Sequence, residues 1–221
     1  MAESGTESDE ERRIYDADRA KAFIDAVVAI AMTLLILPLM ESVGEAAAAD
    51  HGAAVWIDEH QGQLLSFVLS FVIIAMFWMN HHRLFAGVDR VSVPLLWITM
   101  AWLLSIVWLP VATAMSGQMK DTDDLVKTLY IGSMIVTCLL LLVTRIYLAR
   151  HPELHHLTAA VLRRGMAVDL AMAVLFGVAL TVARIYPQLG YWPMFVMVLT
   201  GPVQGLFARA LHAPRRPKPP A

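Results

Sequence analysis

The chain has 221 residues, of which 58% are apolar or aromatic and only 16% are charged, and its mean hydropathy is +0.60. Soluble domains are usually about 25% charged, and one water-soluble core of this length cannot bury so much apolar surface. The composition therefore excludes a soluble enzyme, a secreted disulfide scaffold and a disordered chain. The single cysteine, Cys138, excludes an intrachain disulfide, and the net charge of −2 favours no class of partner.

The first 18 residues form a polar head with seven acidic side chains and without the basic start of a cleavable signal peptide. Six apolar runs follow, each close to the roughly 20 residues that a helix needs to cross a bilayer. The runs are approximately Ala20–Met40, Leu64–Asn80, Val91–Met115, Leu125–Leu148, Ala167–Ile185 and Tyr191–Leu211. The pattern predicts an all-α integral membrane protein with an acidic head (1–18), a domain of six transmembrane helices (19–211) and a basic, proline-rich tail (212–221).

The positions of Lys and Arg predict how the six spans are oriented. With a cytoplasmic N-terminus, the inner segments hold 14 of the 17 Lys and Arg residues, and the outer segments hold only Lys120, Lys127 and Arg184. We therefore expect both termini in the cytoplasm. The outer stretch 41–62 has five acidic residues and no Lys or Arg, so it is either a solvated loop or a vestibule that concentrates cations.

Several kinds of site have no signal in the chain. No span has the repeated Arg or Lys of a voltage sensor, and the last connection between spans is too short for a carbonyl-lined filter loop. No nucleophile–base pattern or phosphate-binding loop predicts an enzyme, and we expect no cofactor and no nucleic-acid partner. His151, His155 and His156 could hold a metal only on a helix, and Pro152 favours a solvated loop instead.

Polar residues at one end of the first two spans form a candidate network. Asp25 lies inside the first apolar run, where a charge is costly and is usually functional. The second run returns to the same depth with the segment FWMNHHRLF, so its polar residues are expected partners for Arg19 and Asp25. These partners are Trp78, Asn80, His81 and His82. The network either fixes helix packing or contacts an ion directly.

The first span also has a distinct apolar face. At about 100° per residue, Phe23, Ile30, Leu34 and Leu37 fall on one side of the helix, with Thr33 at its border and Asp25 pointing elsewhere. Such a stripe faces lipid in most membrane proteins. Around a symmetry axis, however, Ile30, Leu34 and Leu37 would form successive hydrophobic rings that can close a pore by dewetting.

Two segments resemble the transmembrane protein 175 family of endosomal and lysosomal potassium channels and their bacterial relatives. The segment Arg19-Ala-Lys-Ala-Phe23-Ile24-Asp25 is similar to the family signature of Arg, three residues and Phe-Ser-Asp, and WMNHHRLF is similar to its Trp-x-x-His-His pattern. Ile24 replaces the signature serine and removes one hydroxyl from the network. Pro38 is also expected to splay the outer end of the span.

The resemblance implies a potassium channel of modest selectivity in a bacterial plasma membrane, assembled as a homotetramer in the lipid bilayer. By position, the first span of each subunit would line the pore, with Ile30 as its narrowest ring and with Leu34 and Leu37 extending it. Thr33 would be the hydroxyl layer that distinguishes potassium ions from sodium ions. The residues supporting the pore would be Arg19, Phe23, Asp25, Trp78 and His81.

Two other functions remain open at this point. A proton-coupled secondary transporter could use Asp25 and His81 as a relay, although the chain has no evident inverted repeat. A non-conducting membrane scaffold could use its His-rich cytoplasmic loops to bind a partner. Flux through reconstituted protein distinguishes the three possibilities.

Overall fold

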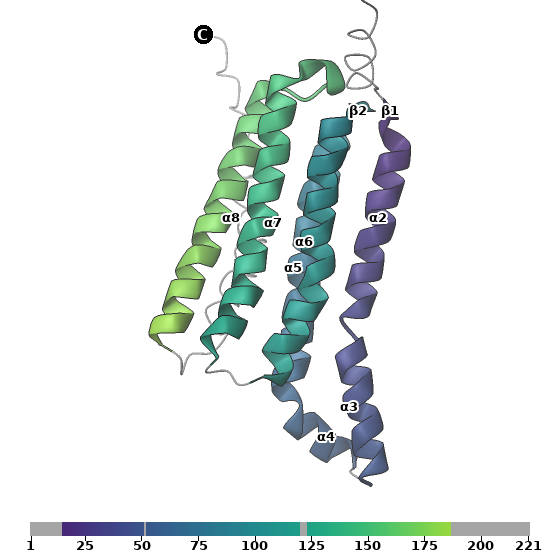
Figure 1. Ribbon diagram of the computed structural model, residues 1–221, viewed down its shortest axis with the longest axis vertical. Helices are drawn as coiled ribbons and strands as arrows, with labels where there is room; N and C mark the ends of the chain where they lie inside the picture. Colours follow the sequence, from purple (N-terminus) through teal and green to yellow (C-terminus); the bar gives the residue numbers. More distant parts are fainter. Residues whose placement is uncertain (1–14, 51, 120–122, 187–221) are drawn as a thin grey trace, which may run out of the picture.

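The computed structural model describes residues 15–50, 52–119 and 123–186, and within these ranges the protein is a helix bundle with one two-stranded sheet (Figure 1). The strands are β1 (Tyr15–Asp16) and β2 (Arg90–Val91). The helices are α2 (Ala17–Leu34), α3 (Leu37–Ala48), α4 (Ala53–Glu59), α5 (Gln61–Phe85), α6 (Val93–Gln118), α7 (Asp124–Arg150), the short 3-10 helix η1 (Pro152–Leu154) and α8 (Ala159–Ile185).

Five helical stretches in the described residues are long and apolar enough to cross a membrane. They are Ala17–Ala48, which combines α2 and α3, and the four helices α5, α6, α7 and α8. Each coincides with most or all of one of the first five apolar runs, so the all-α class is confirmed. The predicted sixth span, Tyr191–Leu211, lies outside the described residues, as do the acidic head and the basic tail, except for a few residues of the head.

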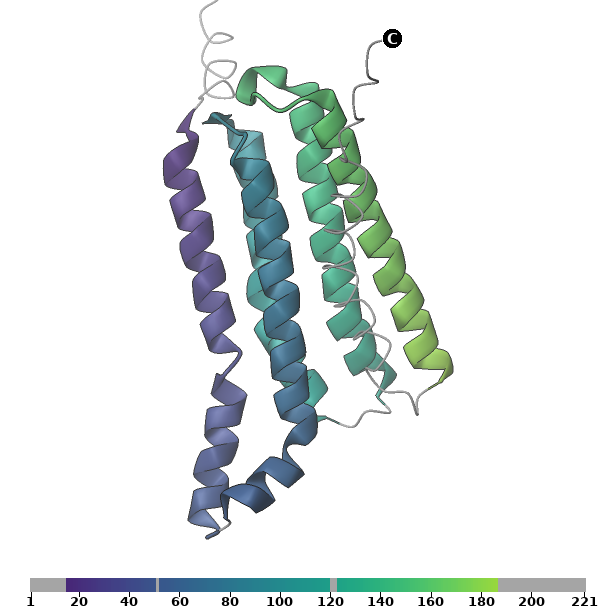
Figure 2. The ribbon, with the colours of Figure 1, turned by 180° about the vertical axis from the view of Figure 1, so that it is seen from behind.

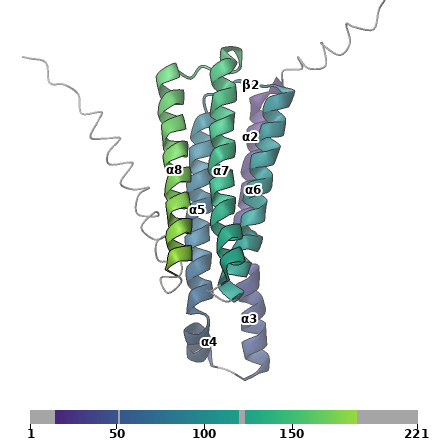
Figure 3. The same cartoon turned by 60° about the vertical axis from the view of Figure 1, so that its left-hand side comes forward.

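Long helices run side by side through the bundle, and α5 and α6 lie between α2 and the α7–α8 pair (Figures 1 and 2). Figure 3 shows α8, α7 and α6 from another side, with α2 behind α6. The interior of the bundle is apolar and well filled. Its largest fully buried side chains include Trp102, Tyr130, Ile74, Leu109 and Met134.

The first span is interrupted in its second half, between Leu34 and Leu37. Pro38 has no backbone N–H, so the carbonyl of Leu34 cannot receive the usual helical hydrogen bond from that position. Helix α2 ends at Leu34, α3 begins at Leu37, and the amide of Leu39 bonds to the carbonyl of Ile36 at 3.1 Å. The break expected from Pro38 is therefore present.

Helices α3 and α4 extend beyond the other helices at one end of the bundle (Figures 1 and 2). The sequence pattern suggested a loop or vestibule wall for 41–62, but much of this stretch is helical, and its Ala-rich segments are strong helix formers. The indole N–H of Trp56 on α4 donates to the hydroxyl of Ser42 on α3 at 3.2 Å, which joins the two helices.

Three chain segments meet at the opposite end, which we call the junction end. Strand β1 pairs with β2 antiparallel, and the amide of Asp89 bonds to the carbonyl of Leu154 at 3.0 Å. Gly87 allows this close approach, because a Cβ there would lie 2.6 Å from Cγ of Leu157. The start of α2, the α5–α6 connection and the α7–α8 connection are therefore held together.

Lys127 is fully buried in the first turn of α7, although it was counted among the outer charges. Its ammonium group donates to the carbonyl of Ala183, at 3.1 Å, in the last turn of α8. Carbonyls at a helix C-terminus lack partners within their own helix and carry partial negative charge. The buried lysine therefore provides a hydrogen bond to a carbonyl in the last turn of α8.

Candidate ion-conduction site

Helix α2 has one face in the bundle and one face outside it. Ala17, Ile24, Val28 and Ala31 are buried on the face toward α5 and α6. These positions recur at helical spacing, as expected for a face that packs against neighbouring helices. Ala20, Val27 and Met32 border this face and pack partly against the core, and the opposite face of α2 is exposed in a single chain.

The predicted apolar stripe lies on the free surface. The exposed fractions are 51% for Phe23, 59% for Ile30, 39% for Leu34 and 47% for Leu37. The first three belong to α2 and Leu37 begins α3, so the stripe continues across the break. A single chain leaves about half of each side chain exposed, and these exposed apolar surfaces must face either acyl chains or another protein surface.

Thr33 is exposed next to this stripe, and its hydroxyl donates to the carbonyl of Ile30 at 2.7 Å. Because its proton is used within the helix, the hydroxyl oxygen presents its lone pairs to the outside. An oxygen in this state can accept a hydrogen bond from water or contact a cation.

Small residues form the part of α2 that lies opposite the buried face. Ala22, Ala26 and Ala29 are exposed, and Thr33 continues their line at helical spacing. In membranes, small residues are typical of surfaces where two helices approach closely. The exposed surface of α6 is different, because it carries large apolar side chains. These are Trp97, Leu104, Val107, Trp108 and Val111.

Asp25 is held by a turn near the C-terminal end of α5. Its carboxylate accepts a hydrogen bond from the indole N–H of Trp78 at 2.8 Å and forms an ion pair with His82 at 3.6 Å. Trp78 and His82 are one helical turn apart and their rings are in contact, so both reach the same carboxylate. Asp25 retains 40% of its side-chain exposure.

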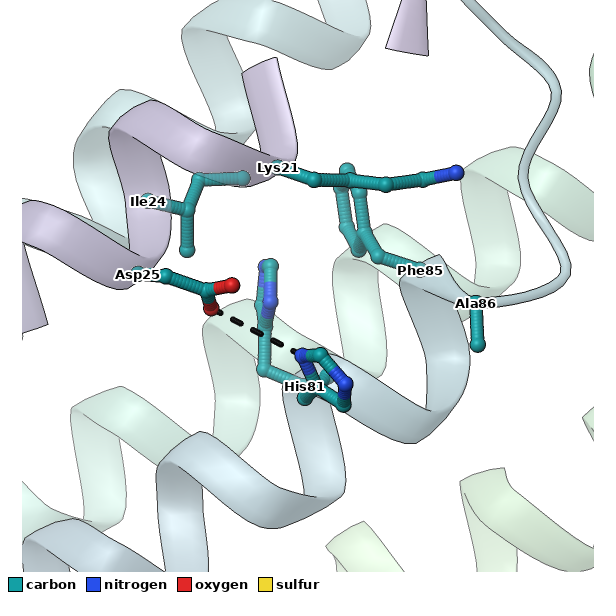
Figure 4. A pocket seen from close by; sticks show the side chains of 7 residues that line it. Lys21, Ile24, Asp25, His81, Phe85 and Ala86 are labelled. Carbon is teal, nitrogen blue, oxygen red and sulfur yellow. Dashed lines mark ion pairs between the residues drawn. The ribbon is translucent and has the colours of Figure 1, made fainter. Parts of the chain in front are cut away.

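A small pocket of about 70 Å³ lies between α2 and α5 at this point (Figure 4). Asp25 and Lys21 line it from α2, and His81 and Phe85 line it from α5. Ile24 also lines the pocket and is only 2% exposed, so the residue at the signature-serine position packs in the core.

The other network candidates have different surroundings. His81 is 1% exposed and stacks against Phe85 and Trp102, with ring centroids 4.2 and 4.1 Å away. Its Nε2 atom is buried without a hydrogen-bond partner. Arg19 is exposed and forms no ion pair within the described part of the chain. Of the expected partners, Trp78 donates a hydrogen bond to Asp25 and His82 forms an ion pair with it, whereas Asn80 and His81 have other neighbours.

A second polar cluster was not anticipated. Arg145 Nε contacts Asp169 Oδ2 at 2.6 Å, Arg145 Nη2 donates to Asn80 Oδ1 at 2.7 Å, and Asn80 Nδ2 donates to Asp169 Oδ1 at 2.8 Å. The arginine and aspartate side chains are 6% and 1% exposed. We call these three residues, from α5, α7 and α8, the buried triad. Opposite charges near the ends of two consecutive apolar runs were the signal that could have revealed it.

The three loop histidines each bond to a different acceptor. His151 Nδ1 lies 2.9 Å from the carbonyl of Tyr147, and His155 Nε2 lies 2.9 Å from that of Leu148. His156 pairs with Asp89 at 3.1 Å. No group of three potential metal ligands occurs among the residues that the structure describes.

Comparisons with known proteins show which family and which relatives the chain is similar to. The model of the family described as "Endosomal/lysosomal potassium channel TMEM175" matches residues 19–110, from the first turn of α2 to the middle of α6. The predicted resemblance is confirmed. A potassium channel of Chryseobacterium sp. (strain P1-3) is 30% identical over 114 residues, covering 52% of this chain and 56% of the relative. A potassium channel of Streptomyces collinus is 33% identical over 110 residues, covering 49% of this chain and 51% of the relative.

The fold has a solved counterpart. A lysosomal potassium-selective channel TMEM175 homolog from Chamaesiphon minutus superposes with a TM-score of 0.68 and 22% sequence identity, over 85% of this chain and 97% of that one. This likeness confirms the TMEM175-type fold of a multi-pass membrane protein. The chain spans about half the length of the bacterial relatives that it matches in sequence.

Proposed function

We propose that the protein is a potassium-permeable cation channel of modest selectivity, in which four copies surround a central pore lined by α2. The small-residue face of α2 carries this proposal. Ala22, Ala26, Ala29 and Thr33 suit close approach to another helix, and the large side chains on α6 suit lipid. The TMEM175-like match over the same helix and the names of the bacterial relatives support potassium as the permeant ion.

The constriction is formed by the apolar stripe in this proposal. Ile30, Leu34 and Leu37 from four copies make successive rings without any group that coordinates a cation. Water leaves a narrow apolar ring readily, so the rings close the pore by dewetting. Ions then cross when the rings widen and while they keep most of their hydration, which is consistent with modest selectivity.

Selectivity is assigned to Thr33. Its hydroxyl group donates to the carbonyl of Ile30, so the lone pairs of the oxygen point away from the helix. In four copies, four such oxygens would face an ion near the constriction. Potassium loses water at a smaller energetic cost than sodium, and neutral oxygens partly replace that water. This favours potassium without the tight discrimination of a carbonyl filter.

The network around Asp25 anchors the pore helix in this proposal. Arg19, Phe23 and Asp25 begin α2, and Trp78 and His81 belong to the turn of α5 that packs beside them. The hydrogen bond from Trp78 to Asp25 fixes the rotation of α2, which decides the direction in which Ile30 points. The network therefore supports the pore without contacting the permeant ion.

The proposed orientation places the junction end in the cytoplasm of a bacterial cell, because most Lys and Arg residues lie there. The opposite end then bears the exposed acids of α3 and α4. Glu41, Glu45, Asp58 and Glu59 would ring the outer mouth and concentrate cations. The proposed domain limits are unchanged: a head (1–18), the channel domain (19–211) and a tail (212–221).

Recording from purified protein in planar bilayers tests this function. We expect discrete single-channel steps that reverse near the potassium equilibrium potential under a potassium gradient. A transport rate with a turnover ceiling and pH-driven accumulation would support the Asp25–His81 transporter instead. Absence of any potassium flux would support the scaffold.

Cross-linking tests the placement of α2. In a Cys138→Ser background, Ile30→Cys should form intersubunit disulfides under mild oxidation, because the ring residues meet at the axis. Trp97→Cys, on the large-residue face of α6, is the matched control and should form no intersubunit disulfide. Cross-linking of Trp97→Cys alone would place the wrong face at the centre and refute the pore.

A further inference from the structure

We propose that the buried triad is a positioning network for the pore helix, through which the α7–α8 pair sets the placement of α2. The proposal rests on the proposed function, in which the orientation of α2 determines whether the constriction is open. The triad residues form no hydrogen bond or ion pair with Ile30 or Thr33 in the described part of the chain.

The triad is a closed ring of three hydrogen bonds. Each of Asn80, Arg145 and Asp169 contacts both of the others, at 2.6 to 2.8 Å. Charge-assisted bonds of this length are among the strongest in proteins, and the burial of Arg145 and Asp169 strengthens them further. The position of Asn80 is therefore tied to α7 and α8.

Gly165 makes room for the guanidinium group. A Cβ at this position would lie 2.7 Å from Nε of Arg145, with other guanidinium atoms closer still. Glycine inside a helix lowers helix stability, so this glycine is useful because Arg145 lies against the backbone of α8. A methyl group there would push the guanidinium away from Asp169 without removing any polar group.

One turn of α5 connects the triad to the pore helix. Asn80 faces the triad, whereas Trp78 and His82, two residues away on either side, hold Asp25 of α2. His81 on the same turn stacks on Trp102 of α6. Since a helical turn is rigid, a rotation or shift imposed on Asn80 also moves the two side chains that hold Asp25.

The arrangement of the helices makes this turn a direct connection. Helices α5 and α6 lie between α2 and the α7–α8 pair (Figures 1 and 2). A shift of α7 and α8 can reach α2 through α6, which packs against both α7 and α2, and through α5, which the triad joins to α7 and α8 by polar contacts. The α7–α8 pair is thus suited to bias the open–closed equilibrium of the pore.

Single-channel recording tests the coupling. Asn80→Ala breaks the link to α5 and keeps the Arg145–Asp169 ion pair. We expect the ratio of open to closed time to change by about fivefold or more, the lower range of coupling between protein sites. The unitary conductance and the potassium-to-sodium permeability ratio should stay at the wild-type values, because Ile30 and Thr33 are untouched. Gly165→Ala should change the ratio of open to closed time in the same direction as Asn80→Ala.

A matched control and a double variant separate positioning from general weakening. Thr137→Val removes the buried 3.0 Å hydrogen bond from Thr137 to Ser105 between α7 and α6, away from α5, and should leave the open-to-closed ratio unchanged. In an Asp25→Asn background, where the link is already weakened, Asn80→Ala should have little further effect. If Asn80→Ala changed the open-to-closed ratio by the same factor in the Asp25→Asn background as in wild type, the proposal would be overturned.

A readout without conduction separates this proposal from the proposed function. Lys21 of α2 and Ala86 after α5 line the same pocket, so cysteines at these positions can be joined by a short cross-linker in a Cys138→Ser background. Asn80→Ala should slow this cross-linking and Thr137→Val should not. Equal rates overturn the positioning role even if the protein conducts, whereas slowed cross-linking in a protein without potassium current refutes the proposed channel alone.

Discussion

Replacement of Asp169 by leucine gives a direct measure of how much the buried triad stabilises the bundle. The variant removes the carboxylate and leaves the guanidinium of Arg145 buried, with one neutral partner in Asn80. Leaving one member of a buried ion pair uncompensated costs about 3–5 kcal/mol. For a chain of this size each kcal/mol lowers the melting temperature by roughly 2–4 °C, so we expect a decrease of about 6–20 °C.

Thermal unfolding of the detergent-solubilised protein, followed by tryptophan fluorescence, measures this decrease. The matched variant combines Asn80→Leu, Arg145→Met and Asp169→Leu, which replaces every polar member by an apolar side chain of similar size. We expect it to unfold close to the wild-type temperature, because no charge is left buried. If Asp169→Leu melts within about 2 °C of wild type, the guanidinium has another partner and our account of the triad is wrong.

The remaining predictions concern the pore. Ile30→Asn should wet the constriction and raise the potassium leak of proteoliposomes, whereas Leu104→Asn on the lipid-facing surface of α6 should not; equal leak from both variants would count against the ring. Thr33→Ala should lower the potassium-to-sodium permeability ratio, measured as a shift in reversal potential, and an unchanged potential would remove Thr33 from selectivity. The double variant Glu41→Gln and Glu45→Gln should lower the unitary conductance in about 0.01 M salt and much less near 1 M, where exposed charges are screened over a few ångströms; a loss independent of salt would contradict a purely electrostatic role.

The apolar runs were sufficient to predict the helices. Each described span contains a run of about the length needed to cross a bilayer, and such runs are the strongest signal that a membrane protein carries. Depth along the spans was also predictable. Trp78 bonds to Asp25 because the second span returns to the level at which the first began.

Angular relations between helices were harder to predict. Arg145 fitted the positive-inside pattern, and Asp169 lay at the edge of its apolar run, so neither one demanded a partner. Their contact depends on the relative rotation of α7 and α8, which the sequence of either helix does not determine. The same holds for His81, which directly precedes His82 in the sequence but turns toward α6.

The helical part of the outer stretch was missed for a different reason. Its acidic residues indicated solvent exposure, and exposure was taken to mean a loop. Ala-rich segments form helices in solvent as readily as in a bilayer, so the charge pattern determined the environment and not the backbone conformation. The run of four alanines between Glu45 and Asp50 was the available signal.

The pairing of β1 with β2 has a consequence for biosynthesis. The residues that precede α2 bond to a segment that is translated only after the second span, and that segment in turn bonds to the connection before α8. During synthesis the first helix therefore enters the bilayer with its starting end untethered. The contacts of this end are complete only after the α7–α8 connection has been translated, so in the proposed channel the assembly of copies is expected to follow synthesis of α7.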